Sequence, residues 1–431
     1  HSDLRRQRQM CIRDRYQMSG STYPLKGIKV VEFSHMVLGP SCGLILADLG
    51  ADVVKVEPAP KGDKTRYLPG SGSGFFGAFN RNKRSVTVNL KSPEGHKFAI
   101  NLIRQSDVLI ENFGKGVMDR LELGYKYTQE INTKLIYCSL KGFLSGPYEN
   151  RAALDEVVQM MGGLAYMTGP KGRPLRAGAS VNDLVGALFG VVAIQAALLE
   201  RQHTGKGTFV RSGLFESNMF LVSNHMVQYF QTGMAAEPMP DRKASWAIYD
   251  IFQTADEEQI FVGVVSDKQW VEFCKAFDLE DLLNNKALST NTQRVAQRNE
   301  FMPRLHKMLK THNLSQIVEI LECFGLPFAP IMRPDQLFDD PHVNHPGATV
   351  EVTLSNGVRA KVPTLPIEYN GARPSLYQDL PKIGEHNEAI AQELGYSDEE
   401  LEVLRSSFES STPNKKICLL YTSDAADEGH C

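Results

Sequence analysis

The sequence has no cysteine pattern of the kind that builds a disulfide framework or a zinc site. Its seven cysteines are an odd number, lie far apart and include no Cys-x-x-Cys pair. We therefore expect no bound metal and a reducing, cytoplasmic compartment. The chain also has no basic excess, since its formal net charge is -3. This charge gives no reason to expect binding to nucleic acid or to an anionic membrane.

Long hydrophobic runs are missing as well. The longest candidate, Leu184–Leu199, contains glycines and is short for a bilayer, so it predicts a buried core helix and no membrane span. Of the 431 residues, 42% are hydrophobic and 23% are charged, which allows a sizeable core. A chain of this length corresponds to two or three domains, or to one large α/β unit with an appended part.

The two ends of the chain lack hydrophobic periodicity. We expect residues 1–17 and 412–431 to be non-native or disordered tails, because both resemble translated adapter sequence. The Arg-rich beginning leaves a mitochondrial targeting peptide as the rival interpretation, which Asp3 and Asp14 weaken.

From residue 25 onward, short apolar runs alternate with helical segments. A strand, a helix and a second strand form a βαβ unit, which implies a parallel sheet with a right-handed crossover. Residues 18–224 are therefore predicted to form a Rossmann-like α/β domain. The predicted strands are 28–33, 52–57, 85–89, 108–110, 135–140 and 208–210, and the predicted helices include 41–49, 93–105 and a long one from Leu184.

The pattern changes after about residue 223. Residues 225–330 are predicted to form a smaller α+β domain, because two alternating strands at 249–252 and 259–264 precede several helical segments. Residues 331–411 are predicted to be a linker and a C-terminal part that returns to the large domain. A hairpin is expected around Asn356-Gly357, since this dipeptide suits a left-handed turn.

The usual nucleotide motifs are missing. The first βα turn, Ser34–Pro40, has no Gly-x-Gly-x-x-Gly pattern. Gly205-Lys206-Gly207 stands at the end of a predicted helix rather than at its start, so it is not a Walker loop. The predicted α/β domain therefore gives little support for NAD or ATP as a ligand.

Asp183 is the main candidate for chemistry, because it immediately precedes the long predicted helix. It is expected to cap that helix, and the helix start is expected to lower its pKa and keep it ionised. Its small neighbours leave room for a bulky substrate: Gly178, Ala179, Gly186 and Ala187. An ionised, accessible carboxylate can act as a covalent nucleophile.

Several short motifs occur in one order along the chain and together resemble the family III CoA-transferases, which include the formyl-CoA:oxalate and carnitine enzymes. The resemblance covers about residues 25–405. The motifs that carry it are residues 25–33, Gly39-Pro40, 49–57, 62–66, 80–85, 91–95, Glu111-Asn112-Phe113, 204–207 and Gly384-Glu385-His386.

The resemblance implies an enzyme that moves coenzyme A from an acyl-CoA to a free carboxylate, a short-chain mono- or dicarboxylate. Asp183 falls on the nucleophile that carries coenzyme A as an aspartyl-CoA thioester. No cofactor is bound permanently, because the coenzyme A thioester is the substrate. Contacts to coenzyme A fall on His35, Asn112, Phe113 and Arg120.

The resemblance also implies an interlocked homodimer of two ring-like subunits, with each active site between the large domain of one and the small domain of the other. The chain departs from the pattern in two places. Val37 and Pro58 stand where relatives often have a polar and a basic contact to coenzyme A. The glycine-rich closing loop of the oxalate enzymes is not evident at 238–245.

Two other functions remain open. An α-methylacyl-CoA racemase needs two acid/base groups, one of them a His immediately before the position of Asp155. Leu154 stands there and cannot move a proton. The third interpretation is a non-catalytic coenzyme A-binding protein on the same scaffold.

Overall fold

The computed structural model describes residues 23–242 and 245–409, so the predicted tails at 1–17 and 412–431 lie outside the described residues. The chain divides into two compact units. Of the described residues, the first unit contains 23–240 and 345–409, and the second contains those between 241 and 344. The predicted small domain, 225–330, differs from this second unit at both ends.

Two backbone hydrogen bonds are consistent with these bounds. The Met239 N–H donates to the Met167 carbonyl at 2.9 Å, which ties the segment before residue 240 to the first unit. The Ile331 N–H donates to the Gln259 carbonyl at 2.9 Å, which keeps the segment after residue 330 with the second unit.

The first unit is built on a six-stranded parallel sheet with the strand order β3-β2-β1-β4-β5-β6. This is the strand order of the Rossmann fold, and the order reverses between β1 and β4. The prediction of an α/β domain with a parallel sheet is therefore confirmed. The strands are β1 Lys29–Phe33, β2 Asp52–Pro58, β3 Lys83–Val88, β4 Val108–Glu111, β5 Ile136–Lys141 and β6 Phe209–Gly213.

Both faces of this sheet are covered, which explains why its strands are nearly continuous apolar runs. Successive residues alternate between the faces, so Val31 and Leu109 pack in one buried cluster while Val30 and Val108 pack in the other. The helices of the first unit are α2 Leu38–Asp48, α3 Phe75–Phe79, α4 Pro93–Arg104, α5 Val117–Arg120, α6 Tyr125–Ile131, α7 Asp155–Met161, α8 Leu164–Thr168, α9 Val181–Thr204, α10 Leu214–Leu221, α11 Ser223–Thr232, α17 Asn387–Glu393 and α18 Asp398–Glu409, with short 3-10 turns η1 Lys64–Tyr67 and η2 Gly70–Gly72.

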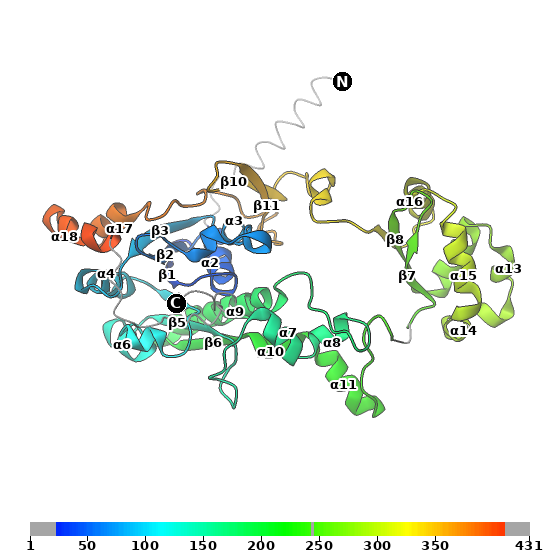
Figure 1. Ribbon diagram of the computed structural model, residues 1–431, viewed down its shortest axis with the longest axis horizontal. Coiled ribbons are helices and arrows are strands. Elements are labelled where there is room, and N and C mark those ends of the chain that lie inside the picture. Colours follow the sequence, from blue (N-terminus) through cyan, green and yellow to red (C-terminus); the bar gives the residue numbers. More distant parts are fainter. Residues whose placement is uncertain (1–22, 243–244, 410–431) are drawn as a thin grey trace, which may run out of the picture. The chain divides into compact units, whose positions relative to one another are not determined.

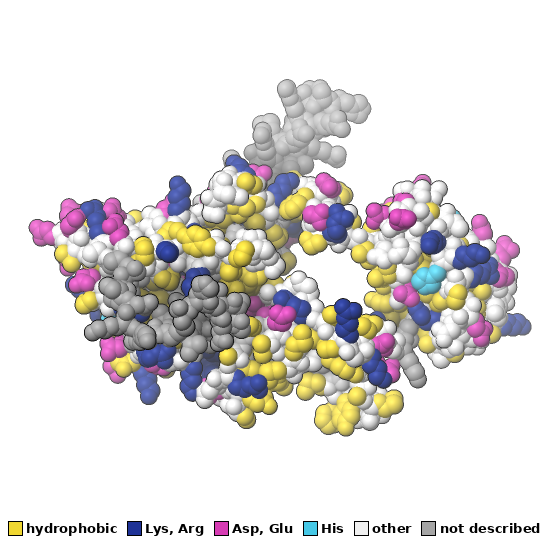
Figure 2. Space-filling view, viewed as in Figure 1, with side chains coloured by type: hydrophobic (Ala, Val, Ile, Leu, Met, Phe, Trp, Pro, Cys, Tyr) yellow, Lys and Arg dark blue, Asp and Glu magenta, His cyan; other side chains and the backbone are white. Residues whose placement is uncertain are grey.

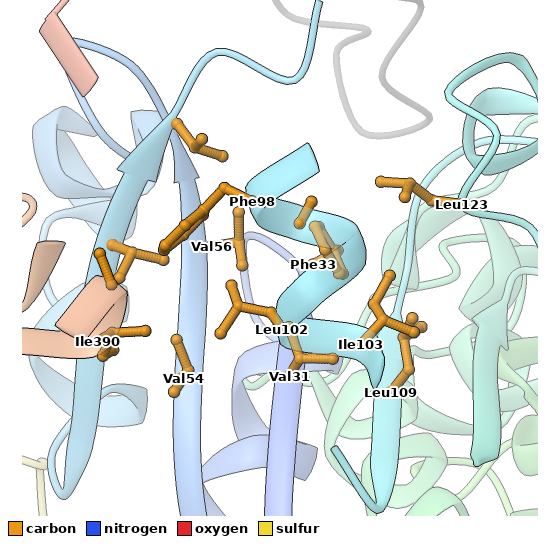
Figure 3. Close-up of a cluster of buried hydrophobic side chains, with 14 of the residues drawn as sticks. Val31, Phe33, Val54, Val56, Phe98, Leu102, Ile103, Leu109, Leu123 and Ile390 are labelled. Atoms are coloured by element: carbon orange, nitrogen blue, oxygen red, sulfur yellow. The ribbon is translucent and has the colours of Figure 1, made fainter. Parts of the chain in front are cut away.

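The end of the chain completes one face of the sheet. Helices α17 and α18 lie beside β3 and α4 in Figure 1, although they follow them by about three hundred positions. Phe98 of α4 contacts Phe408 of α18, with ring centroids 5.5 Å apart. Figure 3 shows Phe98 and Ile390 of α17 among the strand side chains of this cluster. The prediction that this segment returns to the large domain agrees with this packing.

Helix α9 packs on the other face, against α2, β5 and β6. By length and composition it could cross a membrane, a test that the core helix of a soluble protein also passes. Gly190 lets it lie close to the sheet, because a Cβ there would come within 2.8 Å of Leu140 Cδ2. The predicted burial holds for this side only, since Leu188, Phe189 and Val192 on its other side are exposed.

The second unit has its own antiparallel sheet, in the order β7-β8-β9, and its own core. Trp270, Phe273 and Leu305 pack there against Phe252 and Ile260 of the sheet. Its elements are β7 Ile248–Gln253, β8 Gln259–Val264, β9 Phe328–Pro330, α12 Asp267–Ala276, α13 Glu280–Leu283, α14 Asn291–Ala296, α15 Arg298–Leu309, α16 Leu314–Cys323, η3 Lys286–Leu288 and η4 Gln336–Asp339.

The predicted hairpin is present in the first unit. Strands β10 (Thr349–Thr353) and β11 (Arg359–Pro363) pair in antiparallel register. The turn between them requires glycine, because Gly357 has a φ of 81°.

A cluster of buried charges joins the first three strands of the parallel sheet. Glu32 on β1 is fully buried between two lysines, with Lys83 Nζ at 2.8 Å and Lys55 Nζ at 3.4 Å. Burial would raise the pKa of Glu32, but the two ammonium groups outweigh it, so the pKa lies below its ordinary value. Lys55 also pairs with Asp63 at 2.9 Å.

We predict that Glu32→Gln destabilises the protein by about 3–5 kcal/mol, because it leaves two buried ammonium groups without their shared carboxylate. Urea denaturation of the purified protein measures the loss. The control is Glu388→Gln, which breaks an exposed pair with Arg405 and is expected to cost at most about 1 kcal/mol. Equal, small losses in both variants would contradict the prediction.

Candidate active site

A pocket of about 990 Å³ opens at the carboxyl end of the parallel strands. His35 follows β1, and Asn112 and Phe113 follow β4, so the pocket lies where the strand order reverses. Ligands of open α/β sheets bind at this place, because the loops after β1 and β4 diverge there and leave a crevice. All five residues singled out from the sequence line this pocket: His35, Asn112, Phe113, Arg120 and Asp183.

Asn112 holds the turn that carries His35. Its Oδ1 accepts from the His35 N–H at 3.1 Å and from the His35 Nδ1 at 3.2 Å, while its Nδ2 donates to the His35 carbonyl at 2.9 Å. The His35 ring lies 5.8 Å from the Phe113 ring, centroid to centroid. The three predicted contacts to coenzyme A thus form one interacting group.

The next residue in this turn, Met36, has a left-handed backbone with a φ of 63°. A non-glycine residue in this region costs roughly 1–3 kcal/mol, so the surroundings must hold it. Thr65 Oγ1 accepts from the Met36 N–H at 3.0 Å and donates to Asp63 Oδ1 at 2.7 Å. Asp63 in turn pairs with the buried Lys55, which links the turn to the charge cluster beneath it.

Arg120 ends the short helix α5 at the pocket wall and is exposed. Gly116, at the start of this helix, has a φ of 72°, a left-handed conformation that favours glycine. Among residues 23–242 and 245–409, Arg120 forms no ion pair, whereas the neighbouring Lys141 pairs with Glu111 at 2.7 Å. An exposed guanidinium in this position suits the phosphate groups of a ligand.

Asp183 is not the cap of its helix, contrary to the prediction. Helix α9 begins at Val181, so Asp183 lies in its first turn. The carboxylate of Asp155 takes the capping role from α7: its Oδ1 accepts from the Asn182 N–H at 2.7 Å and from the Asp183 N–H at 3.2 Å. The side chain of Asp183 is therefore free of the capping bond and borders the pocket.

The predicted low pKa of Asp183 is also wrong. Burial and, to a smaller extent, the nearby Asp155 carboxylate together raise the pKa of Asp183 to about 8, and only Arg176 opposes them. The helix start favours the charged form by a small amount, which the loss of hydration exceeds. The carboxylate is half-buried, so it borders the pocket while most of its surroundings are protein.

Sequence reasoning did not find the residues that support Asp183. Asp155 Oδ2 accepts from Gln159 Nε2 at 2.5 Å, and Gln159 Oε1 accepts from the Ala177 N–H at 2.8 Å. These bonds tie α7 to the loop before α9. The one available signal was an acidic residue at the start of a helical segment, which is too common to identify a partner.

The described part of the chain contains no group of three or more His, Cys, Asp and Glu side chains that could hold a metal ion. The chemistry of the pocket is instead that of a basic carboxylate beside aromatic, amide and cationic side chains. This combination suits acyl transfer to the carboxylate from a large anionic substrate.

The family assignment follows from comparison with known proteins. The model of CoA-transferase family III matches residues 25–387, which include every residue of the pocket. The chain belongs to CoA-transferase family III.

Relatives of known name align with most of this CoA-transferase. The chain is 34% identical to an acyl-CoA transferase of Fusarium pseudograminearum over 393 residues. This alignment covers 88% of this chain and 86% of the relative. The chain is 33% identical to the succinyl-CoA:glutarate CoA-transferase of Homo sapiens over 382 residues, and this alignment covers 87% of each chain. A crystal structure of a CAIB/BAIF family protein from Brucella suis matches with a TM-score of 0.78 and 33% identity, over 87% of this chain and all of that one.

These relatives are transferases, and the chain is an enzyme that transfers coenzyme A. The racemase alternative is not retained, because Leu154 lines the pocket at the position where a racemase needs a second acid/base group. The non-catalytic alternative is not retained either, since the chain matches named enzymes over most of its length.

We predict that the carboxyl of Asp183 titrates near pH 8, protonated below that value and ionised above it. Infrared difference spectroscopy should show a protonated carboxyl band with this midpoint, absent from Asp183→Asn. In Asp155→Asn the midpoint should move to lower pH, because a negative neighbour is lost while the amide oxygen still accepts both backbone N–H groups. A wild-type midpoint near pH 4 would refute the raised pKa, and Glu156→Gln serves as the matched control.

Proposed function

We propose that this enzyme transfers coenzyme A from an acyl-CoA to a free carboxylate, and that Asp183 carries the coenzyme as an aspartyl-CoA thioester. The observation that carries the proposal is a basic, half-buried carboxylate in the wall of the pocket. His35, Asn112, Phe113 and Arg120 lie in the same pocket and are the proposed contacts to coenzyme A.

The first half of the reaction loads the enzyme. The Asp183 carboxylate attacks the thioester carbonyl carbon, the carbon–sulfur bond breaks, and coenzyme A leaves as a thiolate. The thiolate then attacks the aspartyl carbonyl of the mixed anhydride, which releases the donor acid as a carboxylate. The acceptor acid reverses both steps and regenerates the Asp183 carboxylate, so that no proton or electron is gained or lost overall.

The raised pKa of Asp183 makes the first step less unfavourable. A carboxylate of ordinary pKa that displaces a thiolate faces a gap of about 4.5 pKa units, or about 6 kcal/mol. Acylation removes the negative charge just as protonation does, so it relieves the same cost of burial. With a pKa of about 8, Asp183 lies within about one unit of a thiol.

The acids exchanged are proposed to be short-chain mono- or dicarboxylates. The human relative is named for succinyl-CoA and glutarate, and the pocket of this chain holds several cationic side chains besides Arg120. These support a carboxylate substrate and a coenzyme with phosphate groups.

Replacement of Asp183 tests the proposal. Asp183→Ala and Asp183→Asn are expected to lower exchange at least about 1,000-fold, as when other covalent nucleophiles are removed. Their thermal stability should stay close to that of the wild type, because Asp155 supplies the helix cap. After incubation of the wild type with succinyl-CoA, mass spectrometry should find coenzyme A on the peptide that contains Asp183.

The matched control is Asp119→Asn, another aspartate of the pocket, which should keep both exchange and the adduct. Near-normal turnover by either Asp183 variant would refute the covalent mechanism.

The proposed assembly is an interlocked homodimer. An interlocked ring needs a chain that leaves one unit and returns to it, and the second unit is inserted in this way between residues 240 and 345 of the first. The proposal also uses the resemblance to the family.

An exposed apolar face of the first unit supports this assembly. Helices α9, α10 and α11 carry Leu188, Val192, Phe220, Val227 and Phe230, all exposed, and Phe230 is 84% exposed. Figure 2 shows hydrophobic side chains gathered around α10 and α11. An apolar face of this kind marks a surface that another protein covers, and a second copy of the chain is the proposed occupant.

We predict that the protein sediments as a dimer at nanomolar concentration and melts in a single transition, because interlocked rings cannot separate without unfolding. Phe230→Asp should reduce the dimer fraction, since it places a charge in the apolar face. The control is Val403→Asp, which changes an exposed residue of α18 away from that face. A stable, active monomer would contradict the proposal.

The proposed compartment is the reducing cytoplasm. Cys42, Cys138 and Cys274 are buried free thiols, and Cys323 is an exposed one. Unpaired thiols at these positions suit a compartment that keeps cysteines reduced.

A further inference from the structure

Arg176 occupies a fixed position beside the proposed nucleophile. It lies on the loop between α8 and α9 and lines the pocket with Asp183. The backbone on each side is anchored, because the Leu175 N–H donates to a carbonyl of α8 at 3.0 Å and the Ala177 N–H donates to Gln159 Oε1 at 2.8 Å. The Cα is thus held in place, while the side chain keeps 38% of its surface exposed.

The guanidinium of Arg176 is only loosely engaged by protein. Its Nε donates to the Ala177 carbonyl at 3.1 Å. Its two terminal nitrogens lie 3.8 Å from Asp155 Oδ2 and 3.6 Å from Glu156 Oε2, which is too far for a hydrogen bond. Within the described residues these nitrogens donate no hydrogen bond, although their planar fork matches the two oxygens of a carboxylate.

Three other cationic side chains of the pocket either have a close carboxylate partner or have another proposed role. Lys141 is 2.7 Å from Glu111, and Arg211 is 2.9 Å from Glu149, so both already have close carboxylate partners. Arg120 is a proposed contact to coenzyme A. Among these pocket cations, the charge of Arg176 is the one that acts on Asp183.

The catalytic cycle changes the electrostatic surroundings of Arg176. It faces the carboxylates of Asp155 and Glu156, and Asp183 adds a third negative charge when it is ionised for the attack on the donor. When Asp183 carries coenzyme A it is a neutral thioester, which cannot ionise, so this third charge is excluded. The loosely held guanidinium then favours a new anion in the pocket at the stage when the acceptor acid enters.

We propose that Arg176 binds the second carboxylate of a dicarboxylic substrate and thereby selects short-chain dicarboxylic acids over monocarboxylic acids of the same length. The inference rests on the proposed function, because it takes Asp183 as the point at which the acid reacts. One carboxylate of the acid attacks at Asp183, and the other pairs with the guanidinium of Arg176.

The test compares acceptor acids that differ only in a methyl group or a second carboxylate: glutarate with valerate, and succinate with butyrate. The enzymes are the wild type, Arg176→Gln, Arg176→Lys, Arg173→Gln and Arg151→Gln, the last of which removes another arginine that lines the pocket. Exchange is followed by mass spectrometry. Succinyl-CoA is the donor for glutarate and valerate, and glutaryl-CoA is the donor for succinate and butyrate. In a ping-pong mechanism, kcat/KM for the acceptor reports only the reaction of the loaded enzyme. An effect on the donor step therefore does not obscure the comparison.

In Arg176→Gln, kcat/KM for glutarate and succinate should fall about 100-fold, as when one side of a charged pair is removed. The value for valerate and butyrate should change less than about threefold, which also shows that the variant is folded. Arg176→Lys should recover part of the preference, because it restores the charge without the planar fork. Arg173→Gln, which removes an exposed charge outside the pocket from the same loop, should behave like the wild type.

Equal losses with both kinds of acid would overturn the assignment, since they would show that Arg176 acts on Asp183 or on the loop instead. Loss of the preference in Arg151→Gln but not in Arg176→Gln would overturn it as well. A wild type that exchanges with none of these acids and forms no adduct on Asp183 would refute the proposed function itself. These results are distinguishable, because normal wild-type exchange accompanies the first two.

Discussion

The carboxylate of Asp155 fixes the start of α9, and the geometry of the pocket follows from it. The first N–H groups of a helix have no partner within the helix, and Ser180, at the N-cap position, provides none. Asp155 provides one from α7, so the position of one helix is set by a side chain of another. The same carboxylate places a negative charge beside Asp183. Structure and reactivity are therefore coupled at this contact, because the group that orders the helix also adds to the rise in the Asp183 pKa that burial causes.

The pocket combines two arrangements that are unfavourable by themselves. Two carboxylates lie close together at the start of α9, and Met36 is held in a left-handed conformation at the end of β1. Each has its own support. Buried ion pairs of the sheet hold the Met36 turn, since Lys55 connects Glu32 in the core with Asp63, which in turn supports Thr65 beneath that turn. The hydrogen bonds that Asp155 accepts from α9 and from Gln159 hold the carboxylates.

Structural features that depend on residues close together in the chain could be predicted from the sequence, whereas contacts between distant segments could not. Apolar runs located the six strands, and the parallel topology brings His35 and Asn112, which the family resemblance had singled out, to one edge of the sheet. The Asp155 contact was missed, because it joins residues 27 positions apart through a loop without periodicity. The sign of the Asp183 pKa shift was wrong for a related reason: a helix start is a local feature, whereas burial depends on the whole fold. The ends of the second unit depend on contacts between distant segments, such as the Met239–Met167 hydrogen bond, which no sequence pattern marks.

The late arrival of α17 and α18 has a consequence for how the protein is made. Strand β3 receives part of its cover only when these helices emerge from the ribosome, as shown by the Ser85 N–H, which donates to His386 Nδ1 301 positions later. At roughly 5–20 residues per second, that wait lasts roughly 15–60 s. During translation the apolar face around Phe98 therefore lacks its natural partner, and the nascent chain is a natural client for a chaperone until its last helices are synthesised.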